Sequence, residues 1–124
     1  MIESVPVSVL VDTGSSHDFL HPRIAERLRL PLTAVRPFRV YVGNGESLLC
    51  SHMRKATSLV MQNTPFSVDL HVLHVHGPDV ILGMEWLESL GRVTTDYVAK
   101  SMEFVRGDKL IVLSGANPPP AQLS

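Results

Sequence analysis

The stretch that decides the fold covers residues 9–16 and reads Val9-Leu10-Val11-Asp12-Thr13-Gly14-Ser15-Ser16. An apolar segment typical of a β-strand leads directly into an acidic side chain. A carboxylate in such a place is costly unless hydrogen bonds or a shared proton relieve its charge. Gly14 offers a backbone N–H, and Thr13 and Ser15 offer hydroxyls, so the sequence predicts a nest of donors around Asp12. A strand ending in a plain β-turn has the same composition, and the motif alone does not separate the two.

Short β-type segments separated by turn residues continue along the chain. We expect strands over residues 5–11, 38–42, 48–53, 57–62, 66–72, 80–83, 93–98, 102–105 and 109–113. A short helix is expected to begin at Pro22 and to end before Pro31, because proline suits the first helical position and restricts the residue before it. A second is expected over residues 84–90, closed by Gly91. The pattern predicts an all-β protein with one or two short helices.

Length and composition bound the possible functions. The 124 residues suit one domain, which we place at residues 1–113. Residues 114–124 have the composition of a Pro-rich linker, which predicts a disordered tail and a domain from a longer chain. The 11 basic and 12 acidic residues form no basic patch, so we expect no nucleic-acid partner. No apolar run approaches the roughly 20 residues of a membrane span, and no signal pattern is visible.

Cys50 is the only cysteine, so an internal disulfide is impossible. A small apolar filler within a strand is the favoured interpretation of this residue, ahead of a nucleophile. A lone cysteine fits a reducing compartment, and we therefore expect a cytoplasmic protein.

Two later features strengthen a functional interpretation of Asp12. Residues 80–83 read Val80-Ile81-Leu82-Gly83, and an apolar strand ending in glycine lets another backbone approach closely. Between the two motifs, Asn44-Gly45 favours a tight hairpin turn and predicts a flap over a cleft. The sequence holds one Asp-Thr-Gly and no second copy, so it has room for one lobe of a two-lobed enzyme.

Together these residues resemble the retropepsin domain of gypsy-type LTR retrotransposon polyproteins, an aspartic protease. The resemblance covers residues 5–113 and is carried by the Asp-Thr-Gly together with Val80-Ile81-Leu82-Gly83-Met84-Glu85-Trp86-Leu87. It implies a retropepsin-like closed β-barrel, one lobe per chain, and a homodimeric aspartic endopeptidase. By the same resemblance Asp12 is catalytic, Thr13 hydrogen-bonds across the dimer, Gly14 donates to the carboxylate, and Gly83 packs beneath the site.

Three positions depart from the family's pattern. The flap tip reads Gly43-Asn44-Gly45-Glu46-Ser47 and lacks the Gly-Gly-Ile-Gly-Gly of retroviral enzymes, which bears on how substrate is clamped. Glu85 replaces the commoner aspartate before Trp86. Met84 stands where retroviral enzymes carry an arginine, so the ion pair of that arginine is absent.

Peptide hydrolysis needs a base and an acid, and one carboxylate cannot be both at once. Two Asp12 side chains, one per protomer, are expected to share one proton at the two-fold axis, because adjacent like charges cannot both ionise. The ionised carboxylate activates water and the protonated one polarises the scissile carbonyl, so we expect neither a cofactor nor a metal ion. The Ser15 hydroxyl is expected to donate to the outer oxygen of Asp12 and so to give a more acidic optimum than a Ser15→Ala variant has.

The substrate implied is an extended peptide, here the element's own polyprotein, bound across the axis under two flaps. The candidate substrate-binding residues lie in the flap and the pocket walls: Val42, Gly43, Asn44, Gly45, Leu48, Ile81, Leu82 and Gly83. Core packing explains the apolar members of this set, Val42, Leu48, Ile81 and Leu82, equally well.

A zinc site is a different interpretation, because His71, His74 and His76 cluster within six residues. On one strand only His74 and His76 share a face, whereas zinc needs three or four convergent ligands. Histidines of a surface or loop are therefore favoured, and we expect no metal site.

Two further interpretations concern hydrolysis itself. Ser15 or Ser16 with His17 and Asp18 has the letters of a Ser–His–Asp triad, but sequence neighbours seldom have its geometry and no nucleophile elbow is present. The rival that stays open is a retropepsin-like domain that no longer cuts and serves as a dimerisation or peptide-binding module.

Overall fold

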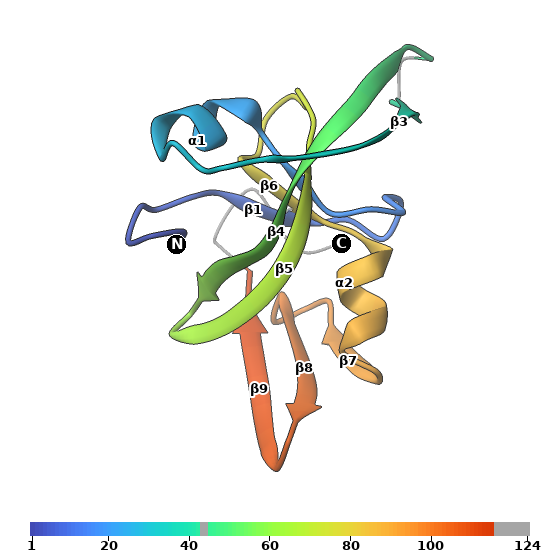
Figure 1. Ribbon diagram of the computed structural model, residues 1–124. Helices are drawn as coiled ribbons and strands as arrows, with labels where there is room; N and C mark the ends of the chain where they lie inside the picture. Colours follow the sequence, from blue (N-terminus) through green and yellow to red (C-terminus); the bar gives the residue numbers. More distant parts are fainter. Residues whose placement is uncertain (43–44, 116–124) are drawn as a thin grey trace.

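The computed structural model describes residues 1–42 and 45–115, and within these it holds two β-sheets and two short helices (Figure 1). The larger sheet is built from β1 (Val9–Val11), β2 (Phe19–Leu20), β3 (Thr33–Tyr41), β4 (Ser47–Met61), β5 (Thr64–Val72) and β6 (Val80–Leu82). The smaller sheet is built from β7 (Val93–Asp96), β8 (Ser101–Arg106) and β9 (Lys109–Ser114). The helices are α1 (Pro22–Arg27) and α2 (Met84–Ser89).

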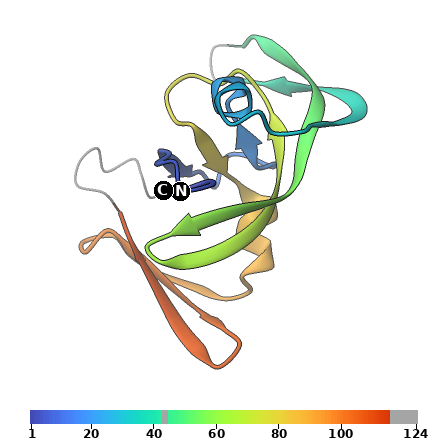
Figure 2. The same ribbon diagram turned by 60° about the vertical axis from the view of Figure 1, so that its left-hand side comes forward.

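The larger sheet has the strand order β1-β6-β2-β5-β4-β3, so that β1 and β3 are its edges among the described strands. The sheet is strongly curled, with β4 and β5 bending as one long hairpin across the molecule (Figure 2). β1 and β6 run parallel with Val11 opposite Leu82, which brings two distant segments of the chain side by side. The expected class, mainly β with two short helices, is confirmed, and the barrel takes the form of a curled half-barrel.

The main core joins the larger sheet to both helices and to the smaller sheet. Alternate residues of β8 and β9 are buried, among them Met102, Phe104 and Leu113. Trp86 of α2 places its ring at 5.6 Å from that of Phe66 and at 6.4 Å from that of Phe104. Burying a large apolar side chain contributes about 1.5–3 kcal/mol, so this aromatic group attaches the smaller sheet to the rest.

The expected strand over residues 5–11 is shorter in the structure, where only Val9–Val11 pair as a strand. The ladder with β6 stops at Ser8, because the N–H of Ser8 donates to the carboxylate of Asp79 at 2.9 Å. Ahead of it, Ile2 is buried and bridges Val5 and Leu59, so the N-terminus packs against β4 without joining the sheet as a strand.

The separate strands expected over residues 48–53 and 57–62 are one strand, β4, with a β-bulge between Arg54 and Thr57. Ala56 lies in the bulge with φ 49°, and its N–H donates to the carboxylate of Asp69 at 2.7 Å. A bulge leaves one residue without a ladder partner and bends the strand. The break in the hydrophobic pattern therefore marks a bend within one strand.

The remaining differences concern the ends of elements. β2 was not expected, and β3 begins at Thr33, ahead of the expected Phe38. Ser114, which was expected to begin the linker, belongs to β9, where the side chain of Gln62 accepts its N–H at 3.0 Å. Residues 116–124 lie outside the described residues. In the described ranges no helix is both long and apolar enough to cross a membrane.

Candidate active site

Asp12 lies directly after β1 in a loop held by backbone hydrogen bonds. Its N–H donates to the carbonyl of Leu82 in β6 at 2.9 Å, and its carbonyl accepts the N–H of Ser15 at 3.1 Å. The N–H of Gly14 donates to the Oδ1 of Asp12 at 2.8 Å. A Cβ at Gly14 would lie 3.2 Å from that oxygen, so the glycine lets the backbone come this close. Asp12 is half-buried, and of the expected nest of donors the N–H of Gly14 reaches its carboxylate, whereas the hydroxyl of Ser15 does not.

Gly83 allows a second backbone segment to pack under this loop. A Cβ at Gly83 would lie 2.4 Å from the carbonyl oxygens of both Ser15 and His17. The next residue, Met84, donates its N–H to the carbonyl of Ser15 at 2.7 Å. The expectation that an apolar strand ending in glycine admits a close backbone approach is therefore confirmed, and the partner is the loop that carries Asp12.

Asp18 ties the same two segments together from within the protein. Its side chain is 3% exposed, and its Oδ1 accepts the N–H groups of Gly83 at 2.7 Å and of Trp86 at 3.4 Å. Burial raises the pKa of Asp18 to about 6, although both hydrogen bonds favour the charged form. Sequence reasoning missed this role; its only signal is an acidic residue placed directly before the apolar pair of β2.

The expected hydrogen bond from Ser15 to Asp12 is wrong. The Ser15 hydroxyl donates to the carbonyl of His17 at 2.8 Å, and a hydroxyl has only one proton to donate. Ser15 therefore closes the turn that follows the Asp-Thr-Gly. The shift in pH optimum expected for Ser15→Ala loses its physical basis. Thr13 is exposed on this single chain.

A cleft of about 670 Å³ borders Asp12. The predicted site residues on its lining are Asp12, Gly14, Ser15, Val42, Leu48 and Ile81. Its floor is an apolar cluster in which Phe19, Cys50, Leu73 and Val75 are buried. Cys50 is thus an apolar filler, as expected, and burial raises the pKa of its thiol.

Leu82 was wrongly expected to form a pocket wall. It is fully buried in the main core, because alternate residues of a strand face opposite sides and Ile81 is the one that faces the cleft. Gly83 supports the loop beneath the site and does not line the cleft. Gly45 is exposed and does not line the cleft, whereas Gly43 and Asn44 lie outside the described residues.

The three clustered histidines separate in space. His71 packs edge-on against Phe38 and His17, with ring centroids at 5.2 and 5.3 Å. His74 instead packs against the ring of His21 at 4.6 Å, with His76 beside it. Within residues 1–42 and 45–115, no three His, Cys, Asp or Glu side chains are arranged to hold a metal ion.

The residues of the suspected triad make other contacts. The Ser16 hydroxyl shares a hydrogen bond of 2.9 Å with His17 Nδ1, and the Nε2 of His17 lies 3.7 Å from a carboxylate oxygen of Glu85. The Asp18 carboxylate faces the backbone of Gly83 and Trp86, so it does not orient His17 as a triad would.

Comparison with known proteins agrees with this geometry. The family model described as "Retroviral aspartyl protease" matches residues 1–110. No curated protein matches the chain.

Two solved structures share the fold. The retroviral protease-like domain of Ddi1 from Leishmania major is 20% identical, with a TM-score of 0.68 over 92% of this chain and 87% of that one. A retropepsin-like aspartic protease from Rickettsia conorii is also 20% identical, with a TM-score of 0.52 over 90% of this chain and 83% of that one. With a carboxylate held at the end of β1, a glycine-bearing strand beneath it and a family match over most of its length, the chain belongs to the retroviral aspartyl protease family.

Proposed function

We propose that this protein is an aspartic endopeptidase that works as a homodimer, with one Asp12 from each chain. The observation that carries the proposal is Asp12 itself, a carboxylate fixed by the N–H of Gly14 at the edge of a large cleft. The chain supplies one Asp-Thr-Gly, and acid–base hydrolysis needs a second group. An identical chain related by a two-fold axis supplies a second Asp12 carboxylate in an equivalent position and equivalent surroundings.

In the proposed dimer the two Asp12 carboxylates share one proton. The ionised member accepts a proton from water, which attacks the scissile carbonyl, and the protonated member hydrogen-bonds the carbonyl oxygen. The two protonation steps then belong to the pair and not to either residue. Thr13, which is exposed on the single chain, is proposed to hydrogen-bond across the interface and to brace the two loops.

The proposed substrate is an extended peptide. Val42, Leu48 and Ile81 give the cleft apolar walls, which suits apolar side chains around the cut. Residues 38–41 of the edge strand β3, and Val42 and Glu46 after it, also line the cleft. An edge strand can pair with an extended peptide through main-chain hydrogen bonds. We propose further that the natural substrate is the polyprotein of a gypsy-type retroelement that carries this domain.

The proposal is tested by incubating the protein with a library of peptides that carry apolar residues near their centre. Cleavage is expected for the wild type and for Asp108→Asn, which changes a carboxylate in the exposed turn between β8 and β9. Cleavage is expected to vanish for Asp12→Asn. Activity per chain is expected to rise with protein concentration, because association follows mass action.

A non-cleaving module is the alternative. It is favoured if wild type and Asp12→Asn both form dimers in sedimentation experiments and both bind the peptides, but neither cleaves any of them. Equal cleavage by wild type and Asp12→Asn would contradict both readings of the site.

A further inference from the structure

The loop between β5 and β6, residues 73–79, forms part of the cleft wall. Leu73 and Val75 are buried in the cleft floor, and the intervening His74 and His76 are exposed. All four side chains line the same cleft as Asp12. The alternation anchors the loop by its apolar side chains and leaves two imidazoles accessible to a bound peptide.

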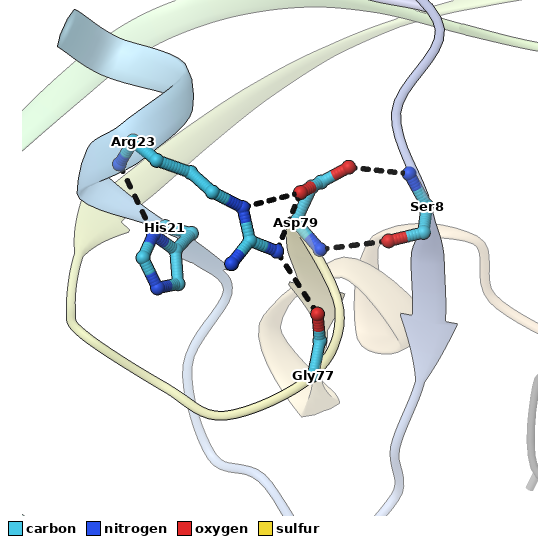
Figure 3. A network of polar contacts seen from close by, with 5 residues as sticks. All are labelled: Ser8, His21, Arg23, Gly77 and Asp79. Carbon is cyan, nitrogen blue, oxygen red and sulfur yellow. Dashed lines mark hydrogen bonds and ion pairs between the residues drawn. The ribbon is translucent and has the colours of Figure 1, made fainter.

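The far end of this loop is fastened to two other elements (Figure 3). Arg23 of α1 donates to Asp79 Oδ1 from its Nε at 2.9 Å and its Nη2 at 2.6 Å, and to the carbonyl of Gly77 at 2.9 Å. Ser8, just before β1, exchanges two hydrogen bonds of 2.9 Å with Asp79. Guanidinium–carboxylate bonds of this kind are directional, so the loop keeps a defined position relative to the strand that carries Asp12.

His21 supports the near side of the loop. Its ring lies edge-on to His74 with centroids 4.6 Å apart, and its Nδ1 accepts the N–H of Arg23 at 3.0 Å. Burial, and then the positive charge of Arg23, lower the pKa of His21. His21 therefore takes up a proton less readily than an exposed histidine does, and its ring supports that of His74.

The charged groups around the cleft are unevenly distributed. Arg39, His17, His74 and His76 are its basic residues, and Asp12 and Glu46 are its acidic ones. Of the basic set, His17 lies within ion-pair distance of Glu85. Behind the loop, Arg23 and Asp79 pair with each other. An imidazole ring has an N–H that can donate to a carboxylate, so the exposed side chains of residues 74 and 76 give this wall donors for an acidic group.

We propose that His74 and His76 form a subsite that recognises an acidic side chain of the peptide, Glu or Asp. The inference rests on the proposed function, because it names a substrate feature for the same cleft. It gives two exposed histidines a role in selecting the peptide. The pair lies at the solvent side of the cleft, above the apolar floor formed by Leu73 and Val75, so the acidic residue is recognised beside the apolar residues near the cut.

The test uses matched peptides that carry Glu or Gln at each position around a cleaved bond. For the wild type at pH 5.5, kcat/KM is expected to be roughly 1.5- to fivefold higher for Glu than for Gln at one position, which is the range of a partly exposed ion pair. The preference is expected to disappear in the double variant His74→Gln/His76→Gln. It is expected to persist in His52→Gln, because His52 is exposed on β4 away from the cleft lining.

Binding of the same peptides to the Asp12→Asn protein separates this inference from the proposed function. Tighter binding of the Glu peptide, lost in the double histidine variant, supports the subsite even if no peptide is cleaved by the wild type. Cleavage without any Glu preference, or a preference that survives the double variant, overturns the subsite and leaves the peptidase intact. Melting temperatures of all variants are compared, and His74→Asn/His76→Asn replaces the Gln pair if the latter unfolds.

Discussion

Gly83 has no room for a side chain, because its added Cβ would lie 2.4 Å from two carbonyl oxygens. Both oxygens belong to backbone that also carries the Asp12 loop, so neither can move without displacing the site. We expect Gly83→Ala to lower the free energy of unfolding by about 1–3 kcal/mol, the range for overpacking, and to reduce peptide cleavage further than the lost stability explains. Urea unfolding and the cleavage assay measure the two effects.

The matched control is Gly107→Ala in the turn between β8 and β9. Gly107 has φ 64°, but nothing lies within 4 Å of an added Cβ. Its replacement is expected to cost about 1 kcal/mol for the left-handed backbone and to leave cleavage by the remaining folded protein unchanged. Equal effects of the two substitutions on cleavage would contradict the account of Gly83.

Asp18 gives the protein a predictable dependence on pH. Its pKa is about 6 in the folded protein against an ordinary value of 3.8, so the folded state binds an extra proton between these two pH values. Stability from this group is therefore greatest below pH 3.8 and falls as pH rises towards 6. Asp18→Asn keeps an acceptor for Gly83 and Trp86 without the charge. We expect it to be more stable than wild type at pH 7, by about 1–3 kcal/mol, with the difference vanishing near pH 4.

Thermal unfolding of the wild type and Asp18→Asn across pH 4–7 measures this difference. Asp96→Asn serves as the control, because Asp96 is exposed and caps the turn after β7. A difference between wild type and Asp18→Asn that stays constant with pH would show that the carboxylate of Asp18 does not titrate as the buried geometry requires.

Besides the apolar core, an ion pair between Arg23 of α1 and Asp79, just before β6, holds the helix to this part of the sheet. Burial alone would raise the pKa of Asp79, but the hydrogen bonds from Ser8 and the guanidinium of Arg23 hold it below its ordinary value. The stabilisation that ionised Asp79 gives to the folded state is thus present above pH 3.8, and it is lost as pH falls through the lowered pKa of Asp79. We expect Arg23→Leu to cost about 1 kcal/mol at pH 7 and much less in strong acid.

Arg27→Leu on the same helix is the control for this ion pair, since it removes a guanidinium from the exposed last turn. Chemical denaturation of both variants at pH 7 and at pH 3 provides the comparison. A cost for Arg23→Leu that is unchanged at pH 3, or that Arg27→Leu shares, would contradict the attribution to Asp79.

The elements that sequence predicted well are those with local signals. Pro22 and Pro31 bounded α1, Gly91 closed α2, and the alternation of residues 66–72 appears as the buried alternate positions of β5. β2 was missed because two residues are too few to show a period, and it is formed only by its neighbours β5 and β6. The two halves of β4 looked separate because a bulge interrupts the pattern without ending the strand.

The candidate site was predictable only where its chemistry is local. Asp12, Thr13 and Gly14 are consecutive residues of one motif, and the hydrogen bond from the N–H of Gly14 to the carboxylate of Asp12 spans two positions. The contacts of Asp18 and Asp79 each join segments far apart in the chain, so no periodicity or spacing announces them. Leu82 was misplaced for a similar reason, since the sequence of a short apolar strand does not tell which side faces the core.

Across the assembled protein, the central claim is that each active centre takes one Asp12 from each of two chains. Mixed dimers test it directly. Wild type and Asp12→Asn are unfolded together in equal amounts, refolded so that chains pair at random, and assayed well above the concentration at which the dimer dissociates. A matched mixture with Asp108→Asn in place of Asp12→Asn measures how much activity is lost in unfolding and refolding alone.

The measurement is the activity of the mixture relative to the same total amount of wild type. If both carboxylates are needed, only pairs of two wild-type chains cleave, and activity falls to about one quarter by random pairing. If each chain cleaves on its own, activity falls only to about one half, as dilution alone requires. A value of one half would contradict the shared active centre.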